Sequence, residues 1–268
     1  MCKECGCGLG GDEVQIGGHA HEHEHEHGQE HHHFHGDEPG HHHPHEHGHQ
    51  TVTLNRSLME KNDRLAERNR GFFEAKKLLV LNVVSSPGSG KTTFIRETAV
   101  RLGRKLRVGV IVGDLATDND AARLRTAGIP VVQITTGTVC HLDAEMVSKA
   151  AAQLDLDQLD VLVIENVGNL VCPADYDLGE ALRVVLLSTT EGEDKPLKYP
   201  PMFHSAQVAV VTKGDLAAAA GFNRDLALAN LQRVSHHARV FELSAKTGEG
   251  MEKWLEFLVA ERGKAGGK

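Results

Sequence analysis

The chain divides near residue 50 into two parts whose hydrophobic and polar positions follow different patterns. Residues 1–50 contain almost no apolar run, whereas the remainder alternates short apolar runs with longer amphipathic stretches. Short apolar runs bounded by loops predict buried strands, and apolar residues at helical spacing predict helices. We therefore expect a tail over residues 1–50, a lead-in helical segment over 51–77 and a folded domain over 78–268.

The folded part predicts strands that alternate with helices. We expect strands at 78–84, 106–112, 129–134, 160–164, 181–187, 207–212 and 239–243. We expect helices at 55–76 (with Gly71 as a possible kink or end), from about Thr92, and at 119–126, 142–154, 224–236 and 250–261. This order is typical of an α/β fold, in which a mostly parallel central sheet has helices on both faces.

Charge is concentrated in the tail. The chain has a formal net charge of −8, but residues 1–50 hold ten acidic residues against one base, Lys3, so the tail carries −9 and the remainder +1. The folded part therefore has no basic excess for a nucleic-acid backbone. No apolar run approaches the roughly 18 residues of a membrane-spanning helix, and the N-terminus does not resemble a signal peptide. We expect a cytoplasmic protein that binds neither nucleic acid nor membrane.

Residues 19–49 hold fifteen of the nineteen histidines, mixed with glutamates. A segment with so few apolar residues cannot offset its ordering entropy, so we expect it to be disordered. Neutral imidazole suits nickel, zinc and copper, and carboxylates add charge. The composition predicts several weak, exchanging metal sites that store or buffer metal. A purification tag or a purely solubilising tail is the alternative.

Three cysteines precede the histidines. Cys2, Cys5 and Cys7 form Cys-x-x-Cys-Gly-Cys, and Gly6 lets the chain fold back so that three thiolates reach one ion. Thiolates are strong ligands for soft metals, so this motif predicts the tight metal site of the tail. The α-amine of Cys2, or the Met1–Cys2 amide, would be a fourth ligand. A redox motif is the alternative.

A phosphate-binding loop follows the first predicted strand. Residues 85–92 have the Walker A spacing, with Ser85 in place of the first glycine. Backbone N–H groups and the helix N-terminus bind phosphate in such loops. Lys91 would reach the β- and γ-phosphates, and the Thr92 hydroxyl would bind Mg²⁺. The expected nucleotide-binding residues here are Ser86, Pro87, Gly88, Ser89, Gly90, Lys91, Thr92 and Thr93.

Two later segments predict that the base is guanine. Residues 212–215 resemble the Asn-Lys-x-Asp motif of GTPases, with Thr212 for Asn, which we expect to weaken loop bracing more than base recognition. Asp215 can accept hydrogen bonds from guanine N1–H and the exocyclic amine, and the Lys213 stem can lie on the base. A surface turn is the alternative for this motif alone. The segment Ser244, Ala245 and Lys246 follows the last strand, where GTPases contact guanine O6.

Acidic residues at two strand ends are candidates for the magnesium and water side of the nucleotide. Asp114 ends the second predicted strand, and Glu165 ends the 160–164 strand just before a turn that contains Gly168. We expect both to act with Mg²⁺. The alternative is that they are only the polar ends of buried strands. Asp118 and Asp120 are nearby candidates that are also consistent with simple helix capping.

Cys140, His141 and Cys172 predict a second metal site beside these nucleotide segments. Cys140 and His141 lie in a Gly/Thr-rich loop, and Cys172 follows the 165–168 turn by a few residues. Taken singly, each residue is more often structural. Adjacent residues rarely chelate one ion in regular structure, so this site needs an irregular loop or ligands shared across a dimer. His204 is a possible extra ligand, although an ordinary loop histidine is the simpler interpretation.

Together these motifs resemble the HypB family of hydrogenase nickel-incorporation GTPases. The resemblance covers the N-terminal Cys-x-x-Cys-Gly-Cys and residues 85–93, 136–142, 165–173 and 190–196, and thus nearly the whole chain. It implies a P-loop NTPase fold of the SIMIBI class, slow GTP hydrolysis with Mg²⁺ and a GTP-dependent homodimer. It also implies insertion of Ni²⁺ into the large subunit of NiFe-hydrogenase, with HypA as partner.

The resemblance further implies roles for individual residues. Cys2, Cys5 and Cys7 match the high-affinity nickel site, and Cys140, His141 and Cys172 match a Zn²⁺ or Ni²⁺ site of the GTPase domain. Lys91, Asp114 and Glu165 are the expected catalytic residues. Urease-type GTPases are similar, but their Cys-Pro-His motif differs from the adjacent Cys140 and His141. Two alternatives remain: a urease-type nickel insertion GTPase, and a nickel store whose GTPase is regulatory.

Overall fold

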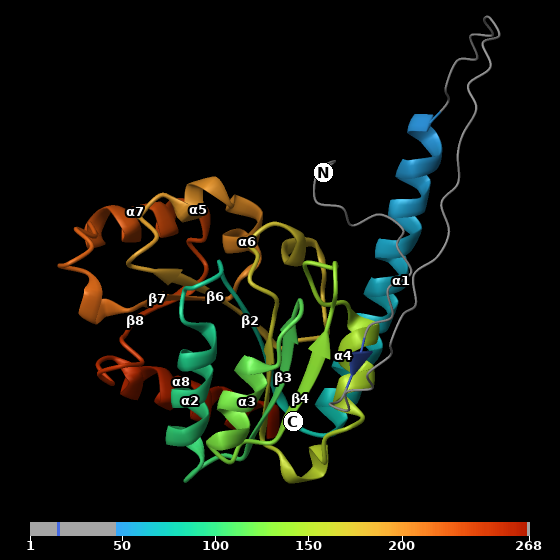
Figure 1. The fold of residues 1–268 in the computed structure, drawn as a ribbon, viewed down its shortest axis with the longest axis horizontal. Helices are drawn as coiled ribbons and strands as arrows, with labels where there is room; N and C mark the ends of the chain where they lie inside the picture. Colours follow the sequence, from blue (N-terminus) through green and yellow to red (C-terminus); the bar gives the residue numbers. More distant parts are fainter. Residues whose placement is uncertain (1–14, 17–46, 267–268) are drawn as a thin grey trace, which may run out of the picture.

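The structure is a computed structural model that describes residues 15–16 and 47–266 (Figure 1). The predicted tail sites, namely Cys2, Cys5, Cys7 and most of the histidine-rich segment, lie outside the described residues. Within the described part, no helix is both long and apolar enough to span a membrane.

The described strands form one sheet in the order β1-β4-β3-β5-β2-β6-β7-β8. Seven of them run parallel, which confirms the predicted α/β class. The two-residue strand β1 (Gln15–Ile16) was not predicted and pairs antiparallel with β4. The parallel strands are β2 (Leu79–Val84), β3 (Val108–Asp114), β4 (Val131–Thr135), β5 (Val161–Glu165), β6 (Leu182–Ser188), β7 (Val208–Thr212) and β8 (Arg239–Glu242).

Alternate side chains of the buried strands pack on helices of opposite faces. Leu79, Leu81 and Val83 of β2 join a core formed with α2 (Lys91–Leu102), α3 (Asn119–Thr126) and α8 (Met251–Gly266). Val80 faces α1 (His47–Ala75) and α4 (Ala144–Ala151), and Val84 faces α6 (Pro200–Ser205) and α7 (Arg224–Val234). The short helix α5 (Lys195–Lys198) precedes α6. Short 3₁₀ turns are η1 (Leu156–Gln158), η2 (Cys172–Asp175) and η3 (Gly214–Leu216).

Helix α1 is longer than the predicted 55–76 segment and passes through Gly71 without ending there. Two buried asparagines attach it to α4, beside which it runs in Figure 1. Asn69 Nδ2 donates to the Ala144 carbonyl (2.8 Å), and Asn62 Oδ1 accepts from the Ala144 N–H (2.9 Å). The lead-in helix is therefore packed onto the domain rather than extended away from it.

The parallel strands end at one edge of the sheet, where ligands bind in open α/β folds. The segments that follow the parallel strands β2 to β8 carry nearly all of the motifs identified in the folded part of the sequence. The candidate sites are therefore built from loops that the sheet brings to a common edge.

Candidate functional site

The loop between β2 and α2 has the geometry of a phosphate cradle. Gly88 and Gly90 have φ angles of 76° and 93°, which disfavour any residue with a Cβ. Ser85, which replaces the usual first glycine, is fully buried and organises the loop from within. Its hydroxyl donates to the Ser86 carbonyl (2.8 Å) and accepts from Lys91 Nζ (3.1 Å). This departure from the Walker A pattern is therefore structurally accommodated.

Lys91 opens helix α2, where the helix N-terminus favours anions. Burial lowers the pKa of the Lys91 ammonium, and the negative charges of Glu165, Asp120, Glu191 and Asp114 partly offset that effect. An anion beside the buried Lys91 ammonium would stabilise its charged form. Lys91 is therefore suited to bind phosphate, which is the role that the sequence predicts for it.

Thr92 and Glu165 meet at the start of α2, where the sequence predicts a Mg²⁺ site. The Thr92 hydroxyl donates to Glu165 Oε1 at 2.7 Å. Glu165 is 2 % exposed, and its second carboxylate oxygen has no hydrogen-bond partner among the described residues. Burial raises the pKa of Glu165 to about 7, although the Thr92 hydrogen bond and Lys91 counteract it. A hydroxyl and a carboxylate with an unused oxygen suit Mg²⁺.

Asp114 ends β3, which neighbours β5 in the sheet, but its carboxylate is engaged locally. It accepts from the Leu115 N–H and from the Thr117 hydroxyl, both at 2.6 Å. Asp118 occupies the N-cap position of α3 without making a side-chain cap hydrogen bond, and it pairs with Arg125 instead. The capping alternative for Asp118 is therefore wrong. Of the predicted acids, Glu165 is the one that contacts Thr92 in this structure.

The segments predicted to recognise the base line one cavity of about 390 Å³. Asp215 Oδ1 accepts from the Ser244 hydroxyl at 2.6 Å, so the two guanine segments are joined directly. Lys213 Nζ donates to the Gly88 carbonyl (2.8 Å) and places its stem beside the phosphate loop. The cavity is lined, among others, by Ser89, Gly90, Thr93, Thr212, Lys213, Asp215, Ser244, Ala245 and Lys246.

Thr212 contacts the phosphate loop. The Thr212 hydroxyl donates to the Ser89 carbonyl at 3.1 Å, and both side chains are buried. The shorter side chain therefore still makes a bracing contact. That this bracing is weaker than an asparagine would give stays a prediction.

Glu191 was not identified as a site residue from the sequence. It follows β6 at the same edge of the sheet, and neither carboxylate oxygen has a hydrogen-bond partner within the described part of the chain. Burial raises the pKa of Glu191, and interactions with the Ser86 hydroxyl, Lys195 and Lys213 oppose that rise. Its position directly after a strand of the predicted sheet was the available signal.

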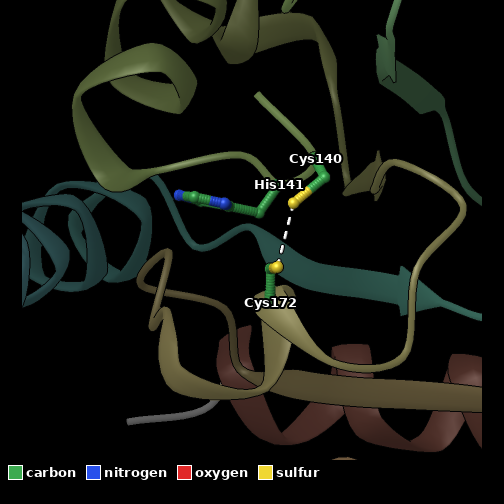
Figure 2. Close-up of side chains that lie close together, drawn as sticks. All are labelled: Cys140, His141 and Cys172. Carbon is green, nitrogen blue, oxygen red and sulfur yellow. Dashed lines mark hydrogen bonds between the residues drawn. The ribbon is translucent and has the colours of Figure 1, made fainter. Parts of the chain in front are cut away.

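Cys140, His141 and Cys172 form a cluster that is suited to a metal (Figure 2). Each offers one ligand atom, and these atoms lie within 4.8 Å of one another. The two Sγ atoms face each other at 2.9 Å, and no disulfide joins them. In tetrahedral Zn²⁺ coordination two thiolates lie about 3.8 Å apart, so the two sulfurs would have to move about 1 Å further apart to bind a metal. The mixed sulfur and nitrogen donor set fits zinc or nickel.

The fold brings these ligands together from two loops. Cys140 and His141 lie between β4 and α4, in the irregular loop that adjacent ligands require, and Cys172 begins η2 beyond β5. The His141 ring stacks on Tyr176, with centroids 3.9 Å apart. Burial lowers the pKa of His141, which favours the neutral, metal-binding form, and its Nδ1 has no partner among the described groups.

His204 does not belong to this cluster. Its Nδ1 lies 3.2 Å from the Val234 carbonyl, and its ring packs edge-on against His237 at 5.3 Å. The prediction of His204 as an additional ligand is therefore not supported. The loop-histidine interpretation is also wrong, because His204 lies in helix α6.

Comparison with known proteins agrees with these motifs. A family model described as the CobW/HypB/UreG nucleotide-binding domain matches residues 79–242. The chain is 51% identical over 212 residues to the hydrogenase maturation factor HypB of Azotobacter chroococcum, covering 79% of this chain and 70% of that protein. It is 52% identical over 205 residues to HypB of Escherichia coli K12, covering 76% and 71%.

Solved structures give the same result for the fold. The structure of HypB from Helicobacter pylori in complex with nickel matches with a TM-score of 0.73 and 40% identity, covering 76% of this chain and 96% of that one. HypB from Archaeoglobus fulgidus matches with a TM-score of 0.71 and 39% identity, covering 76% and 99%.

Proposed function

Because this chain belongs to the CobW/HypB/UreG family of nucleotide-binding proteins, we propose that it is a GTP-dependent nickel metallochaperone that assists the maturation of NiFe-hydrogenase. The observation that carries the proposal is the position of the metal cluster. Its ligands lie in the two loops that follow β4 and β5, and β5 ends at Glu165 beside Thr92. A nucleotide that moves these loops would change the metal site.

The base cavity supports GTP as the nucleotide. Asp215 offers a carboxylate to the N1–H and amine donors of guanine, a donor pair that adenine lacks, and Ser244 holds that carboxylate. Lys91 is proposed to bind the β- and γ-phosphates, and Thr92 and Glu165 to hold Mg²⁺. Asp114 would join them only after leaving its contacts with Leu115 and Thr117. The bound ion would neutralise charge on the transferred phosphoryl group.

Nickel is the proposed cargo, and two kinds of site would handle it. Cys2, Cys5 and Cys7 would hold one ion tightly, and the histidine-rich segment would store more. Cys140, His141 and Cys172 would receive or release metal according to the nucleotide state, with either Ni²⁺ or Zn²⁺ fitting the donors. The nickel complex of the H. pylori relative supports a nickel site in proteins of this kind.

The proposed partners follow from the same family. We expect GTP to favour a homodimer and the protein to deliver nickel to the hydrogenase large subunit together with HypA. The names of the curated relatives, which are hydrogenase maturation factors, support this pathway.

The proposal is tested by measuring the mass of the full-length protein in solution with Mg²⁺, using GDP or a non-hydrolysable GTP analogue, with and without nickel. A dimer that appears with the analogue and changes in amount with nickel would support a GTP switch linked to metal. A monomer under all four conditions would contradict that switch.

A urease role is the second candidate, and one observation favours keeping it. A relative from Helicobacter hepaticus, 39% identical over 217 residues, is named a hydrogenase/urease maturation factor. Affinity capture with purified HypA and with urease accessory proteins separates the two roles. The hydrogenase proposal predicts retention by HypA; retention by the urease proteins alone would contradict it.

A further inference from the structure

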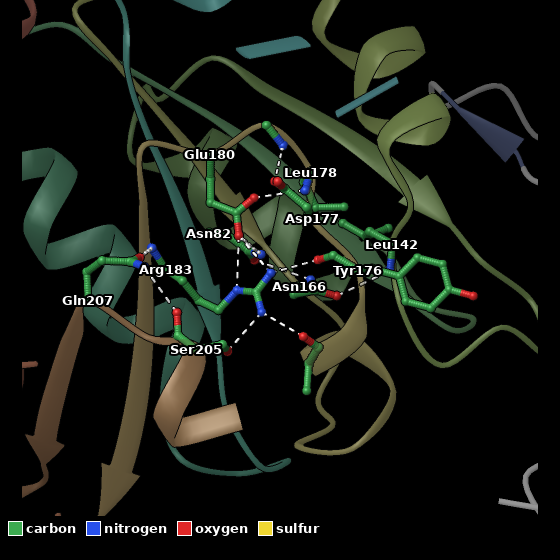
Figure 3. Close-up of polar contacts among 12 residues, drawn as sticks. Asn82, Leu142, Asn166, Tyr176, Asp177, Leu178, Glu180, Arg183, Ser205 and Gln207 are labelled. Atoms are coloured by element: carbon green, nitrogen blue, oxygen red, sulfur yellow. Dashed lines mark hydrogen bonds and ion pairs between the residues drawn. The ribbon is translucent and has the colours of Figure 1, made fainter. Parts of the chain in front are cut away.

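A buried group of polar side chains joins β2, β6 and the segment that follows β5 (Figure 3). It consists of Asn82 in β2, Asn166 directly after β5, Glu180 before β6 and Arg183 in β6, each at most 7 % exposed. We refer to these four residues as the buried polar cluster. None of them is among the residues assigned above to nucleotide or metal.

Asn166 connects the end of β5 to both metal-bearing loops. It follows Glu165, and its Oδ1 accepts from the Val167 N–H (2.9 Å), at the start of the segment that leads to Cys172. The same oxygen accepts from the Leu142 N–H (3.3 Å), the residue directly after His141. One side-chain amide therefore holds the two loops that supply the metal ligands.

The other members of the cluster reach the far side of the metal site. Asn166 Nδ2 donates to Asn82 Oδ1 (3.2 Å), and Asn82 Nδ2 donates to Glu180 Oε1 (3.0 Å). Glu180 is paired with Arg183, also at 3.0 Å.

Arg183 completes the path back to the metal ligands. It donates to the carbonyls of Ala174 (2.9 Å) and Tyr176 (2.7 Å). These carbonyls belong to the segment that starts at Cys172, and the Tyr176 ring stacks on His141. The path therefore leads from the end of β5 to the backbone beside the metal ligands. It contacts Leu142, next to His141, and Ala174 and Tyr176, which follow Cys172.

Core packing alone does not account for this arrangement. Val80 and Val84, two residues before and after Asn82 on β2, point to the same face of the sheet and pack in apolar clusters. An apolar residue at position 82 would suit that face, and buried ion pairs are often replaceable by hydrophobic residues without loss of stability. Burial raises the pKa of Glu180, but Arg183, Asn82 and the Leu178 N–H outweigh that effect and leave it lowered. The cluster is thus held charged and hydrogen-bonded inside the core.

We propose that the buried polar cluster positions the metal ligands according to the nucleotide state sensed at Glu165. The inference rests on the proposed function, because it requires that nucleotide and metal binding are coupled. If engagement of Glu165 shifts the end of β5, the Asn166 amide must exchange its bonds to Val167 and Leu142. The hydrogen bonds through Asn82 and Glu180 then carry the change to the Ala174 and Tyr176 carbonyls. Coupling through such a discrete set of bonds acts equally in both directions.

The simplest competing explanation is that the backbone from Glu165 to Cys172 carries the coupling by itself. Asn82 distinguishes the two explanations, since it lies on another strand and is connected to the path through its side chain. Substitution of Asn82 interrupts the cluster without altering Glu165, the cysteines or His141.

The test compares nickel affinity in the GDP and GTP-analogue states of the full-length protein carrying Cys2→Ala, Cys5→Ala and Cys7→Ala. Thiolate-to-nickel charge-transfer absorption then reports on Cys140 and Cys172. The first variant is Asn82→Leu, which removes the hydrogen bonds to Asn166 and Glu180 while the side-chain volume stays similar. The second is Asn82→Ser, which shortens the side chain but keeps a polar group. Asn230→Leu is the matched control, because Asn230 is a buried asparagine of α7 bonded to the Glu193 carbonyl.

We expect the parent protein and Asn230→Leu to show different nickel dissociation constants in the two nucleotide states, by a factor in the range of about 5–150 that is typical of coupled sites. In Asn82→Leu and Asn82→Ser the ratio of the two nickel dissociation constants should fall toward one. Nucleotide affinity measured without nickel should stay within about twofold of the parent. A merely structural role would weaken both states equally and leave the ratio intact.

An unchanged ratio in whichever Asn82 variant folds would overturn the inference. A ratio of one in the parent protein is a different outcome. It would contradict the coupling in the proposed function, and the inference would fall with it.

Discussion

Glu165 is the residue on which the proposed magnesium site depends. Its carboxylate is buried, bonded to Thr92 through one oxygen and unpartnered at the other within the described structure. Burial raises the pKa of Glu165 to about 7, because desolvation destabilises its ionised form in the nucleotide-free protein. A bound cation would remove that destabilisation. The ionisation of Glu165 is therefore expected to affect the stability of the folded protein, its pH dependence and the binding of a cation.

We predict that Glu165→Gln stabilises the nucleotide-free protein at alkaline pH. The folded protein retains a proton between pH 4.5 and about 7 that the unfolded chain has released, so this group lowers stability as pH rises through that window. At pH 8 the variant should be more stable by up to about 3 kcal/mol. Urea unfolding of both proteins at pH 5 and pH 8 measures the difference, and the titration of all other groups, which the two proteins share, cancels in the comparison. The same pH dependence in both proteins would contradict the prediction.

Asp215→Asn should change the base preference. In the proposed function this carboxylate accepts two hydrogen bonds from guanine, and the Ser244 hydroxyl donates to it. Charged hydrogen bonds contribute about 1.5 kcal/mol or more each, so GTP affinity should fall about 100-fold, while affinity for xanthosine triphosphate rises. Competition against a fluorescent nucleotide measures both. Asp225→Asn, on the exposed start of α7, should change neither. Unaltered GTP affinity in Asp215→Asn would show that guanine lies elsewhere.

Most of the candidate site residues belong to local motifs, which is why the sequence alone can propose roles for them. Residues 85–92 and 212–215 are contiguous, and each follows a strand, so the sequence alone indicates the chemistry. The state of Asp114 could not be predicted, since its carboxylate bonds to the turn that follows it. Glu191 and Asn82 were missed because their roles depend on neighbours from distant strands. His204 was a wrong candidate, because nothing in its local sequence shows which face it occupies.

At the scale of elements, helix α1 is fixed to the domain by a close contact. Gly179 has a φ of 85°, and a Cβ there would lie 2.5 Å from the Ala66 carbonyl oxygen and 2.7 Å from Asn69 Cβ. Only glycine fits at this position without displacing the helix. Because it has no side chain, the loop before β6 lies directly on α1. The packing that positions Glu180 therefore also holds the lead-in helix.

Gly179→Ala should destabilise the protein by about 2–4 kcal/mol, since it combines positive φ with overpacking against helix backbone. Gly71→Ala is the matched control: Gly71 lies in α1 and a Cβ there meets nothing within 4 Å, so the change should stabilise by about 0.5–1 kcal/mol. Thermal unfolding should show opposite shifts of about 2–4 °C per kcal/mol. A neutral Gly179→Ala would mean that α1 is not docked as described.

Helices and strands could be predicted where the apolar runs were clear. Their exact ends depend on helix capping and on pairing between strands. Helix α4 begins at Ala144 rather than 142, because the Asp143 side chain accepts from the Met146 N–H. Strand β3 continues to Asp114 because it pairs with β4 that far. Helices α5 and α6 were not predicted, since each is short and has a proline within its first two residues. The antiparallel β1 has only two residues and no recognisable pattern.

At the scale of the whole molecule, the metal cluster depends on topology. Its two loops follow β4 and β5, which are separated in the sheet by β3. The sequence places Cys140 and Cys172 near nucleotide segments but does not show that they meet. The fold brings the thiols together, and one of their two loops follows Glu165, a residue of the proposed nucleotide site.

Lys91→Ala should abolish GTP hydrolysis and leave nickel binding at Cys140, His141 and Cys172 intact without nucleotide. The reason is that Lys91 contacts Ser85 in the phosphate loop and none of the metal ligands. Phosphate release and nickel titration measure the two activities, with the exposed Lys105→Ala as control. Loss of both activities in a folded Lys91→Ala protein would show that the two sites are one cooperative unit.

The central claim is that nucleotide state and metal affinity are coupled, and one measurement tests it most directly. The affinity of the full-length protein for a GTP analogue with Mg²⁺ is measured with and without nickel, with Cys172→Ser as the control. The coupling predicts that nickel changes the analogue affinity by the same factor by which the analogue changes nickel affinity, and that Cys172→Ser removes the effect. Identical analogue affinities with and without nickel would contradict the account.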